Sequence, residues 1–251
     1  MSGAPLLRVR GLEKRFGGVH AVRHVDLDVL PGERRAVLGP NGAGKTTLFG
    51  LVSGSIFPSA GTVELFGGDV TNVPESQRTR LGLSRTFQTS RVFGGLTVQD
   101  NLYLGALGVR GGRLRPLRTA KDAELRAAGR RGAERVGLGT RLDTLAADLS
   151  HGEQRQLEIG LALVAEPRLL MLDEPAAGLS RSERQLVTEL LLSLEREVTL
   201  VLIEHDMDVA LTVAEQVTMM HEGRVVMEGT PAEIRASKLV RDLYLGSAYA
   251  A

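Results

Sequence analysis

The stretch GPNGAGKTT, at residues 39–47, constrains the fold more than any other part of the chain. It matches the pattern G-x-x-x-x-G-K-[ST], follows a short segment at 33–38 that is expected to form a strand, and precedes an apolar segment at 47–52 that suits a helix. In such a loop, glycines let successive backbone N–H groups surround phosphates, the lysine reaches the β- and γ-phosphates, and the next hydroxyl ligates Mg²⁺. The pattern predicts a strand, a loop and a helix that together bind a nucleoside triphosphate.

The nucleotide-binding residues predicted from this loop are Gly39, Pro40, Asn41, Gly42, Ala43, Gly44, Lys45, Thr46 and Thr47. Among them, Lys45 is also a candidate catalytic residue and Thr46 a candidate Mg²⁺ ligand.

A second segment, LLMLDEP at 169–175, supplies the acids that such a site needs. Its four apolar residues predict a buried strand that carries Asp173 to the carboxyl end, where open α/β sheets bind their ligands. At that position Asp173 can hold Mg²⁺ through water, and Glu174 can orient and deprotonate an attacking water. Hydrolysis is favoured over phosphate transfer to an acceptor, which would not need Glu174. A GTPase is excluded because no asparagine precedes a lysine, as the base-reading motif requires.

The rest of the pattern predicts an α/β protein. Residues 25–29 alternate between apolar and acidic, residues 61–66 are also strand-like, and 199–203 form another continuous apolar run. Residues 97–140, rich in Ala, Leu and Arg, predict helices and a connector. We expect a helix at 181–197, with Leu186, Leu190 and Leu194 on its apolar face, and a hairpin around Glu222–Gly223.

Composition excludes several other classes. A net charge of +1 gives no case for nucleic acid, and the arginines of 110–141 are interspersed with acids, which favours a solvated or partner-facing helix. No cysteine is present for disulfides or thiolate metal sites. No apolar run approaches the roughly 18 residues needed to span a bilayer.

Five further motifs follow in a fixed order around these two segments. They are KRFGG with Phe16, RTFQ with Gln88, LSHGE at 149–153, AAGLS at 176–180, and IEHDM with His205. In these motifs and their order the chain resembles the ATP-binding cassette (ABC) family from end to end. The resemblance implies an adenine-stacking role for Phe16, contact of Gln88 with metal and water, and contact of His205 with the γ-phosphate.

The resemblance also implies the architecture. We expect one ABC ATPase domain over 1–251, an α/β P-loop NTPase with a RecA-like core sheet, an N-terminal antiparallel β subdomain and a helical subdomain. Residues 1–86 and 165–251 are expected to form the nucleotide-binding core with the β subdomain, and residues 87–164 the helical signature subdomain.

LSHGE stands where the family has its signature, which covers ATP bound to a second subunit. Ser150, His151, Gly152 and Glu153 are therefore predicted cross-dimer residues in a homodimer, or in a heterodimer with a second cassette. Ser150 and Glu153 have the spacing of a helix capping box, with Leu157, Leu161 and Val164 as the buried stripe behind them. A carboxylate beside the partner's phosphate would weaken closure unless it turns back onto the cap, and we expect Glu153→Gln to tighten the ATP-induced dimer.

Within transporters, RTFQ, LMLDEPAAGLS, LIEHDM and YLG resemble the branched-chain amino-acid importer group. This implies integral-membrane permeases docked near Gln88 and residues 91–93, indirect coupling to an extracytoplasmic binding protein, and a cytoplasmic location on the inner face of the membrane. The alternatives are import of urea or short amides, lipopolysaccharide export, or a soluble ABC ATPase without a transport role.

Overall fold

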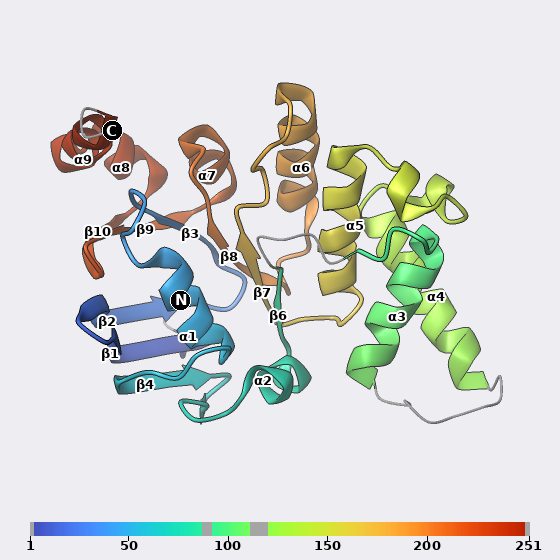
Figure 1. Cartoon of the computed structure of the whole chain (residues 1–251), viewed down its shortest axis with the longest axis horizontal. Coiled ribbons are helices and arrows are strands. Elements are labelled where there is room, and N and C mark those ends of the chain that lie inside the picture. The colour runs from blue at the N-terminus through green and yellow to red at the C-terminus, as the bar shows by residue number, and fades with distance from the viewer. Residues whose placement is uncertain (1–2, 87–91, 111–119, 249–251) are drawn as a thin grey trace.

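The computed structural model describes residues 3–86, 92–110 and 120–248, and these form two sheets and a set of helices (Figure 1). The smaller sheet is antiparallel, in the order β2-β1-β4-β5. Its strands are β1 (Leu7–Phe16), β2 (Val19–Val29), β4 (Ala60–Leu65) and β5 (Gly68–Asp69).

The larger sheet has the order β10-β9-β3-β8-β7-β6. Its strands are β3 (Arg34–Leu38), β6 (Leu83–Arg85), β7 (Leu169–Asp173), β8 (Thr199–Ile203), β9 (Gln216–His221) and β10 (Arg224–Gly229). All neighbours are parallel except β9 and β10, which form the expected hairpin. Every residue of β3, β7 and β8 is buried, as expected for strands covered on both faces, and in β3 the buried residues include Arg34 and Arg35.

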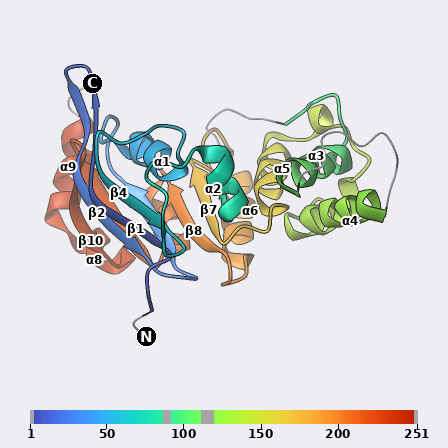
Figure 2. The same ribbon diagram turned by 90° about the horizontal axis from the view of Figure 1, so that it is seen from below.

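Three helices form a lobe at the end of the molecule opposite α8 and α9 (Figures 1 and 2). They are α3 (Val98–Arg110), α4 (Ala120–Arg135) and α5 (His151–Leu163). The remaining helices are α1 (Lys45–Ser53), α2 (Glu75–Leu81), α6 (Arg181–Ser193), α7 (Met207–Val213), α8 (Pro231–Ala236) and α9 (Lys238–Ala248). The expected antiparallel sheet, core sheet and helical region are therefore present, whereas the subdomain boundaries at 86/87 and 164/165 stay a prediction.

The apolar face predicted for 181–197 is wrong at one residue. Leu186 is 53% exposed, whereas Val187, Leu190 and Leu191 are buried. The buried stripe therefore follows 187, 190, 191 and 194, and Leu186 is rotated away from it by about 100°. The helix also ends at Ser193, four residues earlier than expected, because Leu194 is extended.

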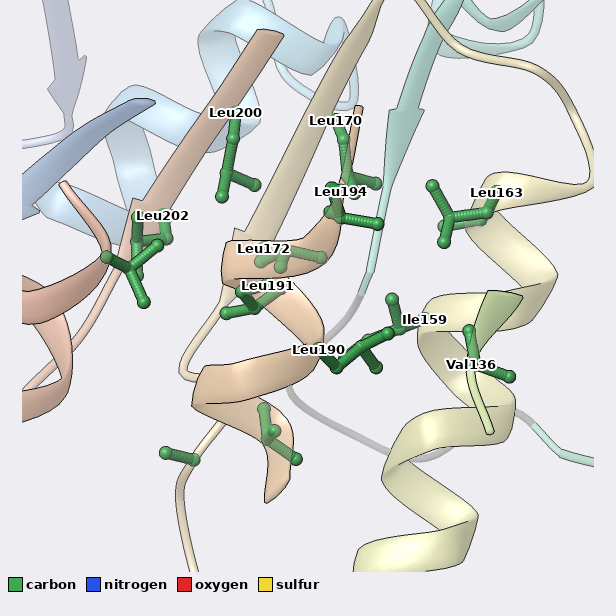
Figure 3. Close-up of a cluster of buried hydrophobic side chains, with 14 of the residues drawn as sticks. Val136, Ile159, Leu163, Leu170, Leu172, Leu190, Leu191, Leu194, Leu200 and Leu202 are labelled. Carbon is green, nitrogen blue, oxygen red and sulfur yellow. The ribbon is translucent and has the colours of Figure 1, made fainter. Parts of the chain in front are cut away.

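One hydrophobic cluster joins the helical lobe to the core sheet (Figure 3). Leu190 of α6 lies beside Ile159 of α5, and the same cluster includes Leu170 and Leu172 of β7. Since α5 packs on α6 and the sheet, its N-terminal end has a set position relative to the carboxyl ends of the strands. No helix in the described part of the chain is long and apolar enough to cross a membrane.

Arg78 on α2 is fully buried and secures the C-terminal end of α1. Its guanidinium donates to five backbone carbonyls, those of Leu51, Val52, Val70, Thr71 and Val73. Burial lowers the pKa of Arg78 to about 10, so the side chain keeps its charge at neutral pH. A buried charge satisfied only by carbonyls is costly to truncate, because the carbonyls lose their donors.

We expect Arg78→Ala to lower the free energy of unfolding by about 3–5 kcal/mol, measured by urea denaturation. The neighbouring exposed Arg80 is the matched control, and Arg80→Ala should stay within about 0.5 kcal/mol of the parent chain. Equal losses in the two variants would contradict a special role for Arg78.

Candidate functional site

The loop at 39–47 connects the end of β3 to the start of α1, and backbone from two other segments presses against it. Gly39 has φ +150°, and a Cβ there would lie 2.2 Å from the carbonyl oxygen of Met220. Gly44 caps α1 at φ +98°, and a Cβ there would lie 2.4 Å from the carbonyl oxygen of Ala21. These glycines are needed because strands β2 and β9 approach the loop too closely for a side chain.

Lys45 is 6% exposed and begins α1. Its Nζ donates to the carbonyl oxygens of Gly39 at 2.6 Å and Pro40 at 3.1 Å, which keeps the ammonium within the loop. Burial lowers the pKa of Lys45, and the nearby carboxylates of Glu174 and Asp173 oppose that shift. The adjacent Thr46 is exposed.

A cavity of about 1250 Å³ extends over this loop. Its lining includes all nine residues of 39–47 together with Glu174 and His205, so the structure brings these predicted residues into one place. The sequence reasoning missed six further lining residues, namely Val19, His20, Ala21, Arg23, Glu222 and Gly223. No local signal marks them, because they reach the cavity only through the packing of β2 and the β9–β10 turn.

Phe16 lies at the end of β1 and is 48% exposed. Lys14 Nζ lies 5.0 Å from the centre of its ring. Among the described residues the cavity is lined by Val19, the cross-strand partner of Phe16, and not by Phe16 itself. Its adenine-stacking role stays a prediction, and Gln88, together with Arg91, lies outside the described residues.

Asp173 is the last residue of β7 and is 1% exposed. Its Oδ2 accepts from Arg85 Nη2 at 3.1 Å, and Oδ1 accepts no hydrogen bond from the residues that the structure describes. Burial raises the pKa of Asp173, and Arg85 counteracts that rise. A buried carboxylate oxygen without a donor is expensive, so Oδ1 is suited to a cation or to a water bound to one.

Glu174 follows with φ +51°, a left-handed conformation that is rare outside glycine. Its Oε1 lies 2.6 Å from Nε2 of His205, which follows β8 by two residues. The two side chains therefore meet because β7 and β8 are paired and end at the same edge of the sheet.

Glu204, the residue between the end of β8 and His205, is a buried carboxylate. It accepts the backbone N–H of Ala176 at 2.7 Å and that of His205 at 3.1 Å. Burial raises the pKa of Glu204 despite these bonds. Glu204 therefore links the segment that follows Glu174 to the segment that carries His205.

The predicted capping box at the start of α5 is confirmed. Glu153 Oε2 accepts the Ser150 N–H at 2.9 Å, and Glu153 Oε1 accepts from Arg141 Nε at 3.1 Å. The Glu153 carboxylate is therefore turned back onto the cap and paired with Arg141. For this reason we no longer expect Glu153→Gln to tighten the dimer.

Glu183 is a second carboxylate at this helix end, and the motif reading missed it. Its Oε1 accepts the Gly152 N–H at 2.9 Å, and its Oε2 accepts the N–H of Ser180, the N-cap of α6. In the described part of the chain, the cavity lining does not include any of Ser150, His151, Gly152 and Glu153. The signature segment and the phosphate loop of one chain are thus separate surfaces.

Comparisons with known proteins agree with the resemblance. Residues 22–177 match the family model described as ABC transporter. The high-affinity branched-chain amino acid transport ATP-binding protein LivG of Escherichia coli strain K12 is 39% identical over 254 residues, covering 97% of this chain and 99% of that protein. BraF of Pseudomonas aeruginosa, which bears the same description, is 36% identical over 252 residues, with the same coverage.

Among solved structures, the ADP conformation of MJ1267, an ATP-binding cassette of an ABC transporter, superposes with a TM-score of 0.87 at 27% identity. The match covers 97% of this chain and 100% of that chain. The chain belongs to the ABC transporter family and is an ATPase subunit that hydrolyses ATP to drive transport.

Proposed function

We propose that the cavity over residues 39–47 is the ATP site, in which Lys45 binds the phosphates and Glu174 is the general base for water. The observation that carries this proposal is the meeting of Lys45, Glu174 and His205 in one cavity at the carboxyl ends of parallel strands. His205 contacts the γ-phosphate in this arrangement. This role is supported by the 2.6 Å distance between His205 Nε2 and Oε1 of Glu174, the proposed base.

Mg²⁺ fits the residues present. Thr46 offers an exposed hydroxyl at the start of α1, and Asp173 offers the oxygen Oδ1 that has no donor in the described chain. Hydroxyl, carboxylate and phosphate oxygens are the ligands that Mg²⁺ prefers. When bound, the ion would neutralise phosphate charge, and Gln88 is proposed as a further contact on the strength of the family resemblance.

We propose that two cassettes close around ATP, either two copies of this chain or this chain and a second cassette. The signature turn, Ser150–Glu153, begins α5 and therefore carries exposed N–H groups and about half a positive charge. It lies outside the cavity of its own chain, which is what an element serving another chain requires. A partner's γ-phosphate supplies the charge that attracts it.

A permease is proposed to dock beside Phe93, which is 60% exposed. The buried side chain of Asn101 on α3 holds the loop that presents it, accepting the Phe93 N–H at 2.8 Å and donating to the Phe93 carbonyl at 3.1 Å. An exposed aromatic ring on a loop with a fixed conformation is typical of the residues that contribute most to protein–protein interfaces. The chain would then lie on the cytoplasmic face of the membrane.

The cargo is proposed to be branched-chain or other hydrophobic amino acids, moved inward with the help of an extracytoplasmic binding protein. Support comes from LivG and BraF, whose names describe branched-chain amino acid transport and which align over nearly their whole length.

We expect Glu174→Gln to bind ATP but to lower turnover by about 10²–10⁴-fold, because the proton acceptor is lost. The ATP-bound dimer should accumulate, as measured by size-exclusion chromatography with and without MgATP. The exposed Glu189 of α6 offers a matched control, and Glu189→Gln should turn over like the parent chain. Full hydrolysis by Glu174→Gln would remove Glu174 as the base.

In the Glu174→Gln background, we expect Glu153→Gln to change ATP-induced dimer affinity by no more than about fivefold. Glutamine can still cap α5, and an exposed ion pair such as Glu153–Arg141 contributes at most about 1 kcal/mol. Analytical ultracentrifugation over a range of ATP concentrations measures the affinity. A tightening of tenfold or more would mean that the carboxylate faces the partner's phosphate after all.

Membranes rebuilt with permeases that co-purify with this chain should take up leucine, isoleucine or valine in an ATP-dependent manner. Phe93→Ser should abolish that uptake while the isolated chain keeps its basal hydrolysis, because the docking anchor is lost and the ATP site is not. Uptake of urea or short amides alone, or movement of lipopolysaccharide with no amino-acid uptake, would overturn the proposed cargo.

A further inference from the structure

Helix α5 carries two features one turn apart. Its first turn is the signature segment, and its next turn carries Arg155, whose side chain is only 12% exposed. Arginine so well shielded on a helix needs a specific set of acceptors, because its charge and five N–H donors would otherwise be unsatisfied.

Those acceptors are three consecutive carbonyls of the catalytic loop, which we define as residues 173–176. Arg155 Nη2 donates to the carbonyl oxygen of Asp173 at 2.9 Å and to that of Glu174 at 2.6 Å, and Nε donates to that of Pro175 at 2.9 Å. Nη1 pairs with the carboxylate of Glu158, which is 10% exposed and lies on the same face of α5. Glu158 thereby orients the guanidinium towards the loop.

The opposite side of the catalytic loop is held through its N–H groups. Glu174 N–H donates to the carbonyl of Ile203 at 2.9 Å, and Ala176 N–H donates to Glu204 at 2.7 Å. The left-handed backbone of Glu174 is therefore maintained by Arg155 from α5 and by the β8–α7 turn on the other side. Among these contacts on the loop, those of Arg155 come from α5, so a shift of α5 acts on the loop through Arg155.

We propose that Arg155 is a positioning residue that conveys the engagement of the signature turn to Glu174 of the same chain. This inference rests on the proposed function, in which the signature turn meets ATP held by the other cassette. Because the capping box makes the start of α5 rigid, displacement of Ser150–Glu153 moves Arg155, and Arg155 moves the carbonyls around Glu174. ATP bound at one site of the dimer thereby affects the position of Glu174 at the other site.

The first test separates positioning from nucleotide binding. Arg155→Gln should lower kcat for ATP hydrolysis by tenfold or more, while the Kd for ATP, measured with a fluorescent ATP analogue, stays within about twofold. Arg155→Lys should recover part of kcat, because one ammonium can reach some of the carbonyls but cannot span all three. An unchanged kcat in Arg155→Gln would overturn the inference.

Arg196 supplies a matched control, since it also donates to a backbone carbonyl, that of Gly32, and pairs with a glutamate, Glu215. It lies before β8, at the amino ends of the strands, and Arg196→Gln should keep the parent kcat. Should Arg155→Gln fail to fold, Glu158→Gln releases the guanidinium without removing it, and should lower kcat by a smaller factor at unchanged ATP affinity. Parent kcat in that variant would then count against the inference.

The second test addresses the coupling itself with a double-mutant cycle. Ser150→Asn keeps an N-cap residue but changes the group offered to the partner's ATP. If Arg155 conveys engagement of the signature turn, the loss in kcat from Ser150→Asn should be at least threefold smaller in the Arg155→Gln chain than in the parent. Losses that multiply within twofold would mean that Arg155 supports the loop independently of the signature.

If Arg155→Gln hydrolyses at the parent rate while Glu174→Gln does not hydrolyse, only the coupling inference is wrong. If Glu174→Gln also hydrolyses at the parent rate, the proposed catalytic site is wrong.

Discussion

The parallel pairing of β3, β8 and β7 is the constraint on which the rest of the structure depends. The register aligns Val37 with Ile203, and Ile203 with Asp173, so the three strands end at one level. The phosphate loop, Glu174 and His205 follow directly from those ends. Parallel strands make this possible because their carboxyl ends share an edge, whereas antiparallel neighbours would send alternate loops to opposite edges.

Backbone contacts refine what the strand ends bring together. Strands β9 and β2 approach the phosphate loop closely enough to require glycine at residues 39 and 44. Glu174 has a left-handed backbone. Its carbonyl accepts a hydrogen bond from Arg155, and its N–H donates to the carbonyl of Ile203. The site is therefore built from main-chain geometry, and the reactive side chains take their positions from it.

Two carboxylates at helix N-termini each cap their own helix and also bond to a residue outside it. Glu153 and Glu183 both complete capping boxes, and each also accepts a bond from outside its own helix. Glu183 thereby ties the start of α6 to the start of α5. The signature turn is thus connected to its own chain at Gly152 through Glu183 and one turn later through Arg155.

Several expectations followed from local patterns. The phosphate loop, the strand before Asp173 and the capping box of α5 each depend on residues within a few positions of one another, and their backbone geometry is set by that short range. The helix at 181–193 was also predictable, but its buried face was not, because Leu186 and Val187 are equally apolar. Only tertiary packing, in the hydrophobic cluster that also includes residues of α5 and β7, selects Val187.

By itself, the sequence determined the residues of the phosphate loop, the strand and helix on either side of it, and the acids at the end of β7, because glycine spacing and apolar runs directly restrict the backbone. Only the tertiary structure decided that Val19 rather than Phe16 lines the cavity, that Glu204 holds Ala176, and that Arg155 holds the catalytic loop. Those contacts join residues that are far apart in the sequence. A buried charge must be paired, and the packing of helices and strands determines which acceptors lie within its reach.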